Sequence, residues 1–166
     1  MTANHNSVVG KNDDTYILGD YSMASKRYRD YLEKETKKLN GRLHLIFGNH
    51  DIKDWKFYID IGFHSVHAPY LEVEEFICVH DPALSAVNRK AKFLCGHIHD
   101  LFLIRKNCLN VGVDVHNFFP ISIDRVREIF NENPITEYNN ERDARYFKES
   151  RDSRREEDNK SNLLGH

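Results

Sequence analysis

The chain has 166 residues, of which 40% are apolar, and it carries 24 basic and 26 acidic side chains for a formal net charge of −2. This size and apolar content suit one compact domain with a sizeable core and are too small for two full domains. The near-zero charge excludes a global field that would draw the chain to nucleic acid or to a membrane, so any partner must be chosen by a local site.

Short apolar runs alternate with helical material in the first third of the chain. Residues 15–18 are predicted as a strand, 21–41 as a helix whose Leu39-Asn40-Gly41 end is typical of a C-cap, and 42–47 as the next strand. A strand, helix, strand unit of this kind predicts parallel neighbours in an α/β sheet.

Closely spaced strands follow residue 63. We expect a hairpin over 63–73, single strands over 76–80 and 92–97, and a hairpin-like pair over 101–113. A short amphipathic helix is predicted over 123–130, closed by Pro134. Charges of both signs dominate beyond Thr136, so residues 1–135 are expected to form the domain and 136–166 a charged tail that is partly helical or disordered.

The three cysteines, Cys78, Cys95 and Cys108, each lie inside an apolar run and lack metal-ligand spacing. We expect them to be reduced core residues. Neither a signal-like N-terminal stretch nor an apolar run of membrane-spanning length is present in the sequence. The expectation is therefore a soluble, cytoplasmic chain without a membrane partner.

Four of the predicted strands end in polar side chains that can bind a metal. These strand ends are Gly19-Asp20, Gly48-Asn49-His50-Asp51, His80-Asp81 and Gly96-His97-Ile98-His99. Ligands of open α/β sheets bind beyond the carboxyl ends of the strands, and glycine permits the close backbone approach that a crowded site demands. Carboxylate, amide oxygen and imidazole together suit a hard or borderline divalent ion, Mn, Fe, Ni, Zn or Mg.

In this order along the chain, the motifs resemble the calcineurin-like metallophosphoesterase family, and in particular its small bacterial-type members without a cap domain. The resemblance covers residues 4 to about 125 and includes the segments NSVVGKNDDTYILGD, GNHD, GHIH and LNVGVDVHNFFPIS. It implies an α/β fold with two mixed β-sheets in a sandwich flanked by helices, the αββα arrangement. It also implies hydrolysis of phosphomonoesters or phosphodiesters by a metal-activated water.

The resemblance assigns a role to each of the matching residues. Asp20 would bridge two metal ions, and the remaining ligands would be Asn49, His80 and His97 for one ion and His99 for the other. His50 would contact the phosphate and protonate the leaving oxygen, and Asp51 would orient the His50 imidazole through a hydrogen bond. Manganese is the favoured ion. The expected partner is a phosphate-ester substrate, with nucleic acid only in the role of substrate.

Members of this family open with a strand that ends in Asp-x-His, a motif that the printed sequence lacks. On this resemblance the chain begins after the family's first strand and helix and keeps a full ligand set for one ion only. Three explanations stand: a fragment of a longer enzyme, a natural degenerate relative, or a strand supplied by another subunit in a homo-oligomer. The alternative function is accordingly a catalytically silent metal- or phosphate-binding module that acts as an interaction subunit.

Other histidines and aromatic residues are more often structural than functional. His44, His64 and His67 alternate with apolar residues on expected strands and are assigned to structure, whereas His116 is left open. The aromatic residues that follow the GNHD segment could stack on a nucleobase but are more often part of the core: Trp55, Phe57 and Tyr58.

Overall fold

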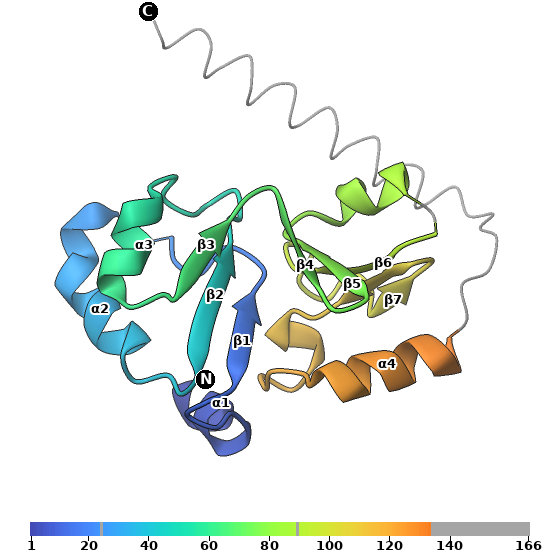
Figure 1. Ribbon diagram of the computed structural model, residues 1–166, viewed down its shortest axis with the longest axis horizontal. Helices are drawn as coiled ribbons and strands as arrows, with labels where there is room; N and C mark the ends of the chain where they lie inside the picture. The colour runs from blue at the N-terminus through green and yellow to red at the C-terminus, as the bar shows by residue number, and fades with distance from the viewer. Residues whose placement is uncertain (24, 89, 134–166) are drawn as a thin grey trace, which may run out of the picture. The chain divides into compact units, whose positions relative to one another are not determined.

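A computed structural model describes residues 1–23, 25–88 and 90–133 (Figure 1). Its helices are α1 (Thr2–Val8), α2 (Arg29–Thr36), α3 (Trp55–Ile61) and α4 (Ile123–Glu132), with 3-10 turns η1 (Lys26–Tyr28), η2 (Pro82–Val87) and η3 (Val113–Val115). Its strands are β1 (Asp14–Ile17), β2 (Arg42–Ile46), β3 (Ser65–His67), β4 (Tyr70–Val73), β5 (Phe76–Val79), β6 (Lys92–Cys95), β7 (Ile104–Arg105) and β8 (Cys108–Asn110). Met1–Ile135 forms one compact unit, an α/β fold with two sheets flanked by helices. The predicted tail, residues 136–166, and the closing Pro134 lie outside the described residues.

The first sheet has the strand order β1-β2-β3, and both of its described pairings are parallel. The expectation of two mixed sheets is therefore wrong for this one. The reason lies in the connections, because α2 joins β1 to β2 and α3 joins β2 to β3. Parallel neighbours require such crossovers, and each crossover returns the chain to the same end of the sheet.

Strand β2 is buried on both faces, and its alternation divides the core in two. Leu43 and Leu45 pack with α2 and α3, in a cluster that includes Leu32 and Tyr58. Ile46 belongs to a second cluster, which contains residues of both sheets and of α4. Full burial of a Leu or Ile side chain stabilises the fold by about 2 kcal/mol. Such burial holds the ends of β1 and β2 beside the second sheet.

The second sheet has the order β4-β5-β6-β8-β7 and is mixed, as predicted. The central pairings β5·β6 and β6·β8 are parallel, and the edge pairings with β4 and β7 are antiparallel. The predicted hairpin over 101–113 is confirmed as β7 and β8, which turn at Lys106 (φ 52°). The predicted helix near Ile123 is confirmed as α4, which stacks Phe130 on Phe76 with ring centroids 5.7 Å apart.

The predicted hairpin over 63–73 is wrong. Strand β3 pairs with β2 in the first sheet, whereas β4 pairs with β5 in the second, so the chain passes from one sheet to the other at Ala68-Pro69. Proline lacks the N–H that a continuing ladder would need. The hairpin in this part of the chain is β4 with β5, which turns at Glu74 (φ 53°).

The helices differ from the sequence expectations more than the strands do. Residues 21–41 were predicted to be one helix, but α2 ends at Thr36, well before the expected Gly41 end. The Thr36 hydroxyl donates to the Leu32 carbonyl in that last turn and contacts the Tyr21 hydroxyl at 2.8 Å, which ties the helix end to the chain before it. Helices α1 and α3 were not predicted. None of the described helices is long and apolar enough to cross a bilayer.

The cysteines and the strand histidines have structural surroundings. Cys78, Cys95 and Cys108 are free and buried, as predicted, and burial raises the pKa of the Cys78 thiol to about 12. His44 lies between Asp14 and Ser65, with its Nε2 2.9 Å from an Asp14 carboxylate oxygen and its Nδ1 2.7 Å from the Ser65 hydroxyl. These contacts give each ring nitrogen of His44 a partner within the chain, so no ligand is needed to explain its position.

Candidate metal centre

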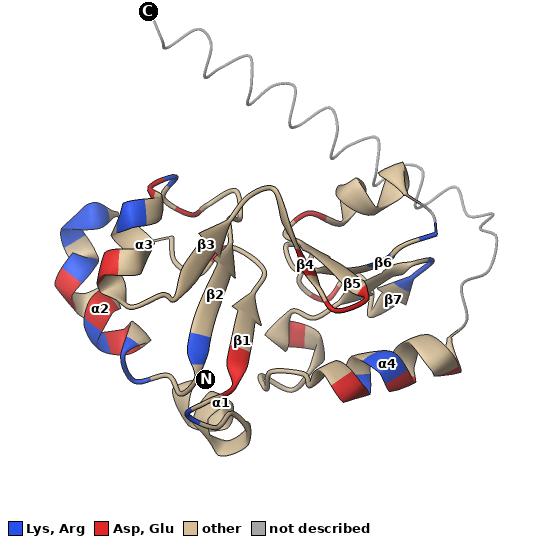
Figure 2. Cartoon of the chain, in the orientation of Figure 1, with Lys and Arg blue, Asp and Glu red and all other residues tan. Residues whose placement is uncertain are grey.

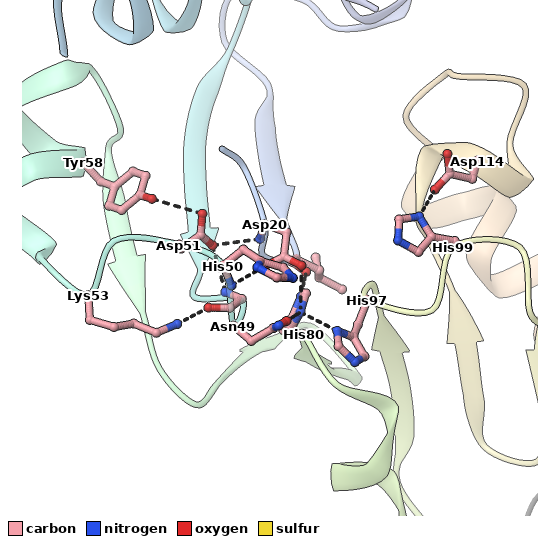
Figure 3. A network of polar contacts seen from close by, with 12 residues as sticks. Asp20, Asn49, His50, Asp51, Lys53, Tyr58, His80, His97, His99 and Asp114 are labelled. Carbon is pink, nitrogen blue, oxygen red and sulfur yellow. Dashed lines mark hydrogen bonds and ion pairs between the residues drawn. The ribbon is translucent and has the colours of Figure 1, made fainter. Parts of the chain in front are cut away.

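Loops from both sheets converge at the carboxyl ends of β1, β2, β5 and β6 (Figure 3). Ligand atoms of Asp20, His80 and His97 all lie within 4.8 Å of one another. The Asn49 side-chain oxygen lies 2.9 Å from His80 Nε2. Four of the five side chains that the sequence nominates as metal ligands are therefore gathered in one cluster.

His80 is the centre of this cluster, and one contact sets its orientation. The side chain is 6% exposed, and its Nδ1 lies 2.8 Å from the Leu18 carbonyl oxygen. Because a carbonyl can only accept, Nδ1 is the protonated nitrogen, and Nε2 faces the cluster. A backbone carbonyl that fixes the tautomer in this way is the usual support for a histidine that binds a metal.

Three polar atoms of other residues lie close to His80 Nε2. Nε2 lies 3.0 Å from His97 Nδ1 and 3.3 Å from an Asp20 carboxylate oxygen, in addition to the Asn49 oxygen. Neighbouring ligands of an ion bound at about 2.0–2.2 Å are themselves about 3 Å apart. The spacing and the donor set therefore both fit a cation.

Two glycines permit the close approach of the loops. A Cβ atom on Gly19 (φ 86°) would lie 2.2 Å from His80 Nδ1, and one on Gly48 would lie 2.2 Å from the Asp20 carboxylate. Neither position can accept a side chain unless the site moves. Asp20 (φ 54°) and His97 (φ 71°) also have left-handed backbones, a conformation that costs free energy for such residues and that is concentrated at functional sites.

Asp51 has a different position from the one that the resemblance implies. Its carboxylate is 4% exposed and accepts hydrogen bonds from the Gly48 and Asp20 backbone N–H groups, both at 2.8 Å, and from the Tyr58 hydroxyl at 3.0 Å. The expected bond to the His50 imidazole is not among the contacts of the described residues. Both oxygens are already engaged, so Asp51 positions the loop backbone rather than the His50 ring.

His50 is exposed at the edge of the cluster. Its backbone N–H donates to the Asp20 carboxylate at 2.9 Å, which places the residue next to the candidate bridging group (Figure 3). The His50 imidazole has no hydrogen bond to the other described side chains, so it is available to a ligand.

His99 lies outside the cluster of Asp20, His80 and His97, so its predicted role beside a second ion stays a prediction. Its side chain is 82% exposed, its Nδ1 lies 3.2 Å from Asp114, and Figure 3 shows the pair apart from the other ligands. The intervening Ile98 is buried, and both histidines have left-handed backbones (φ 71° at His97 and 48° at His99), so the chain turns sharply between them. His116, which was left open, has its Nε2 2.9 Å from the Asn110 carbonyl oxygen.

Three residues that shape these loops were missed by the sequence reasoning. Tyr58, which the sequence pattern favours as a core residue, donates to Asp51. Burial, and then the Asp51 charge, raise the pKa of the Tyr58 hydroxyl, so it remains a donor. Asn110 is fully buried, and its amide donates to the His99 and Phe102 carbonyls at 2.6 and 3.0 Å. The Lys53 ammonium donates to the Gly48 carbonyl. The partners lie 5 to 11 residues away along the chain, a spacing that neither helix nor strand periodicity marks.

Comparisons with known proteins give a fold and no activity. No family model matches the chain. The uncharacterized protein MJ1445 of Methanocaldococcus jannaschii is 28% identical over 146 residues, which cover 81% of this chain and 76% of that protein. The crystal structure of AQ665, a protein of unknown function from Aquifex aeolicus, matches with a TM-score of 0.61 and 22% identity over 77% of this chain and 82% of that one. The structural match is evidence for the α/β fold alone.

Proposed function

We propose that the chain is a metal-dependent phosphoric ester hydrolase of the calcineurin-like metallophosphoesterase type, with that family's αββα fold. The ion would be held by the four converging side chains, Asp20, Asn49, His80 and His97. The observation that carries the proposal is the cluster itself, in which His80 Nε2 lies within 3.3 Å of all three other groups. The order of the strand-end motifs supports the same conclusion.

The donor set favours a borderline divalent ion. One carboxylate, one amide oxygen and two imidazoles suit Mn, Fe, Ni or Zn, and Mg less well, and manganese is the ion we would supply first. When bound, such an ion would supply Lewis acidity to the phosphoryl oxygens and to the attacking water.

The residues of the chain have separate tasks in this reaction. A water oxygen forms the new bond to phosphorus as the ester P–O bond breaks, and the His50 ring gives a proton to the departing alcohol oxygen. The proton that the water loses returns to the ring through solvent, so the ring ends in its starting state. Asp51 holds the Gly48 and Asp20 backbones in place, so that the Asp20 carboxylate keeps its position. These tasks require a rigid loop more than a mobile one.

Hydrolysis of bis(p-nitrophenyl) phosphate with added Mn²⁺ tests the proposal. We expect His97→Ala to lower kcat/KM by about a hundredfold, because supporting residues alone change metal sites by about 10–100-fold. His99→Ala is the matched control, since both histidines follow β6 and only His97 is in the cluster. Equal activity of His97→Ala and the unmodified chain would rule the proposal out.

A second candidate is a metal- or phosphate-binding module without turnover. The position of His99 favours it, because the described ligands gather around a single point and a two-ion clamp needs more of them. Calorimetry should show one Mn²⁺ per chain under either function, with binding lost in Asp20→Asn. Absence of hydrolysis with intact binding would select the module, and turnover would select the enzyme.

A further inference from the structure

Trp55 presents an exposed aromatic surface at the end of the segment that carries Asn49 and His50. It is the first residue of α3, it is 52% exposed, and it is the one tryptophan of the sequence. Phe57 and Tyr58, the other aromatic residues of that helix, are buried. An indole ring left half in water next to a polar site is the kind of surface on which planar ligands stack.

The position of the indole is fixed relative to the ligand loop. The Trp55 ring meets the Phe47 ring edge-on, with centroids 5.7 Å apart, and Phe47 directly precedes Gly48. Asp54 caps α3 by accepting from the Phe57 N–H and forms an ion pair with Lys26. Trp55 is thus a pre-organised surface next to the loop that carries Asn49 and His50, and little freedom would be lost when a ligand binds.

Lys53 adds a positive charge to the same segment, beside the Phe47 ring that Trp55 also contacts. Its ammonium donates to the Gly48 carbonyl and lies 5.2 Å from the Phe47 ring centroid. The ion pairs of the described residues leave Lys53 without a carboxylate partner. A cation next to a phosphate-binding loop and an aromatic surface beyond it match a ligand with a phosphate at one end and a planar base at the other.

The surrounding charge argues for a small ligand rather than a nucleic-acid strand. Figure 2 shows acidic and basic residues interleaved along α2 and α3. Several are paired with each other, such as Lys37 with Glu33 and Lys56 with Asp60. A polyanion needs a continuous basic stripe, which these helices do not offer in the described residues.

We infer that the site takes nucleotide-type phosphate esters, with the base stacked on Trp55 and a phosphate oxygen bound by Lys53. This inference rests on the proposed function, because it names the substrate class of the same site. Trp55 is a specificity residue in this account, and it takes no part in bond cleavage.

Fluorescence of the single tryptophan is a direct readout that needs no turnover. With Mn²⁺ present, we expect adenosine 5′-monophosphate to quench Trp55 saturably. Ribose 5-phosphate, which has the same phosphate and sugar without the base, should leave the emission unchanged. By calorimetry the nucleotide should bind about tenfold more tightly than ribose 5-phosphate, the advantage expected from one stacked base.

Variants separate the base contact from the phosphate contact. Trp55→Ala should remove the tenfold advantage and leave ribose 5-phosphate binding unchanged, whereas Trp55→Phe should keep part of it. Lys53→Met should weaken both ligands by the same factor. Tyr31→Ala is the control, because Tyr31 is 61% exposed on α2 and should affect neither ligand.

The failure of this inference differs from the failure of the proposed function. Equal affinity for the two ligands, or a Trp55→Ala variant that weakens both alike, would overturn the nucleotide inference even if the chain hydrolyses other phosphate esters. Lack of binding by either ligand would overturn it as well. A chain that keeps the tenfold preference but hydrolyses no phosphate ester would contradict the proposed enzyme function and leave the nucleotide inference standing.

Discussion

Two of the four loops that carry candidate ligands are held by opposite kinds of buried group. The loop after β2 is organised by the Asp51 carboxylate, which accepts from two backbone N–H groups and the Tyr58 hydroxyl. The loop after β6 is organised by the Asn110 amide, which donates to the His99 and Phe102 carbonyls and accepts from the Gly112 N–H. The first loop thus presents N–H groups inward, and the second presents carbonyls.

The two loops also differ in how many of their predicted metal ligands reach the cluster: Asn49 of the first loop does, whereas on the second loop His97 does and His99 does not. Asp51 binds the backbone of Gly48 and of Asp20, so it ties the ends of two strands together and holds both at the cluster. Asn110 donates to the backbone carbonyl of His99 itself, and the His99 side chain turns to Asp114. A buried polar group is effective only when every partner has the complementary sign.

Replacing the donor amide at the second loop with an acceptor carboxylate should have the largest effect on stability. Asn110→Asp would place a buried carboxylate against two carbonyl oxygens, so we expect the free energy of unfolding to fall by about 4 kcal/mol, as for an uncompensated buried charge. Urea denaturation measures it. Asn117→Asp, the same change at an exposed position, should alter stability by less than about 0.5 kcal/mol. Comparable stability of the two variants would refute this account of the second loop.

The opposite change, from a carboxylate to an amide at the first loop, should lower the free energy of unfolding by less. Asp51→Asn removes the charge and leaves a single acceptor oxygen for three donors, so we expect a loss of about 2 kcal/mol. Mn²⁺ affinity should fall with it, because the Asp20 backbone loses its support. The exposed Asp100→Asn is the matched control. If Asp51→Asn retained full stability and affinity, the carboxylate could not be what organises this loop.

Tyr58→Phe should have the smallest effect, a loss of about 1 kcal/mol from one donor to Asp51. It should also change the pH dependence. Since the pKa of Tyr58 is raised in the folded chain above its ordinary value near 10, the protonated hydroxyl contributes stability that is complete below about pH 10 and lost as the pH rises further. Unfolding measured at about pH 7 and about pH 11 should therefore show a smaller alkaline loss in the variant. An unchanged alkaline loss would exclude the Tyr58 contribution.

Several elements were predictable because their signals are local. Periodic apolar runs marked β1, β2, β5, β6 and the β7–β8 hairpin, and an amphipathic pattern marked α4. Helix α3 had a signal that was overlooked, since Asp54 is a suitable N-cap residue and Gly62 (φ 118°) a suitable end. The 63–73 hairpin was mispredicted because adjacent apolar runs reveal that strands exist and say nothing of which sheet each joins.

The sequence by itself determined which side chains stand at the strand ends and that glycines precede them, because these features follow from chain order and residue type. Only the tertiary structure decided which of those side chains meet. Asp20 and Asn49 follow the parallel strands β1 and β2 of one sheet, and His80 and His97 follow the parallel strands β5 and β6 of the other. The four gather because a shared core holds the two sets of strand ends together, whereas His99 turns to Asp114. The role of Asp51 was decided in the same way, by the Asp20 N–H after β1, 31 residues away, and by the Tyr58 hydroxyl of α3, 7 residues away.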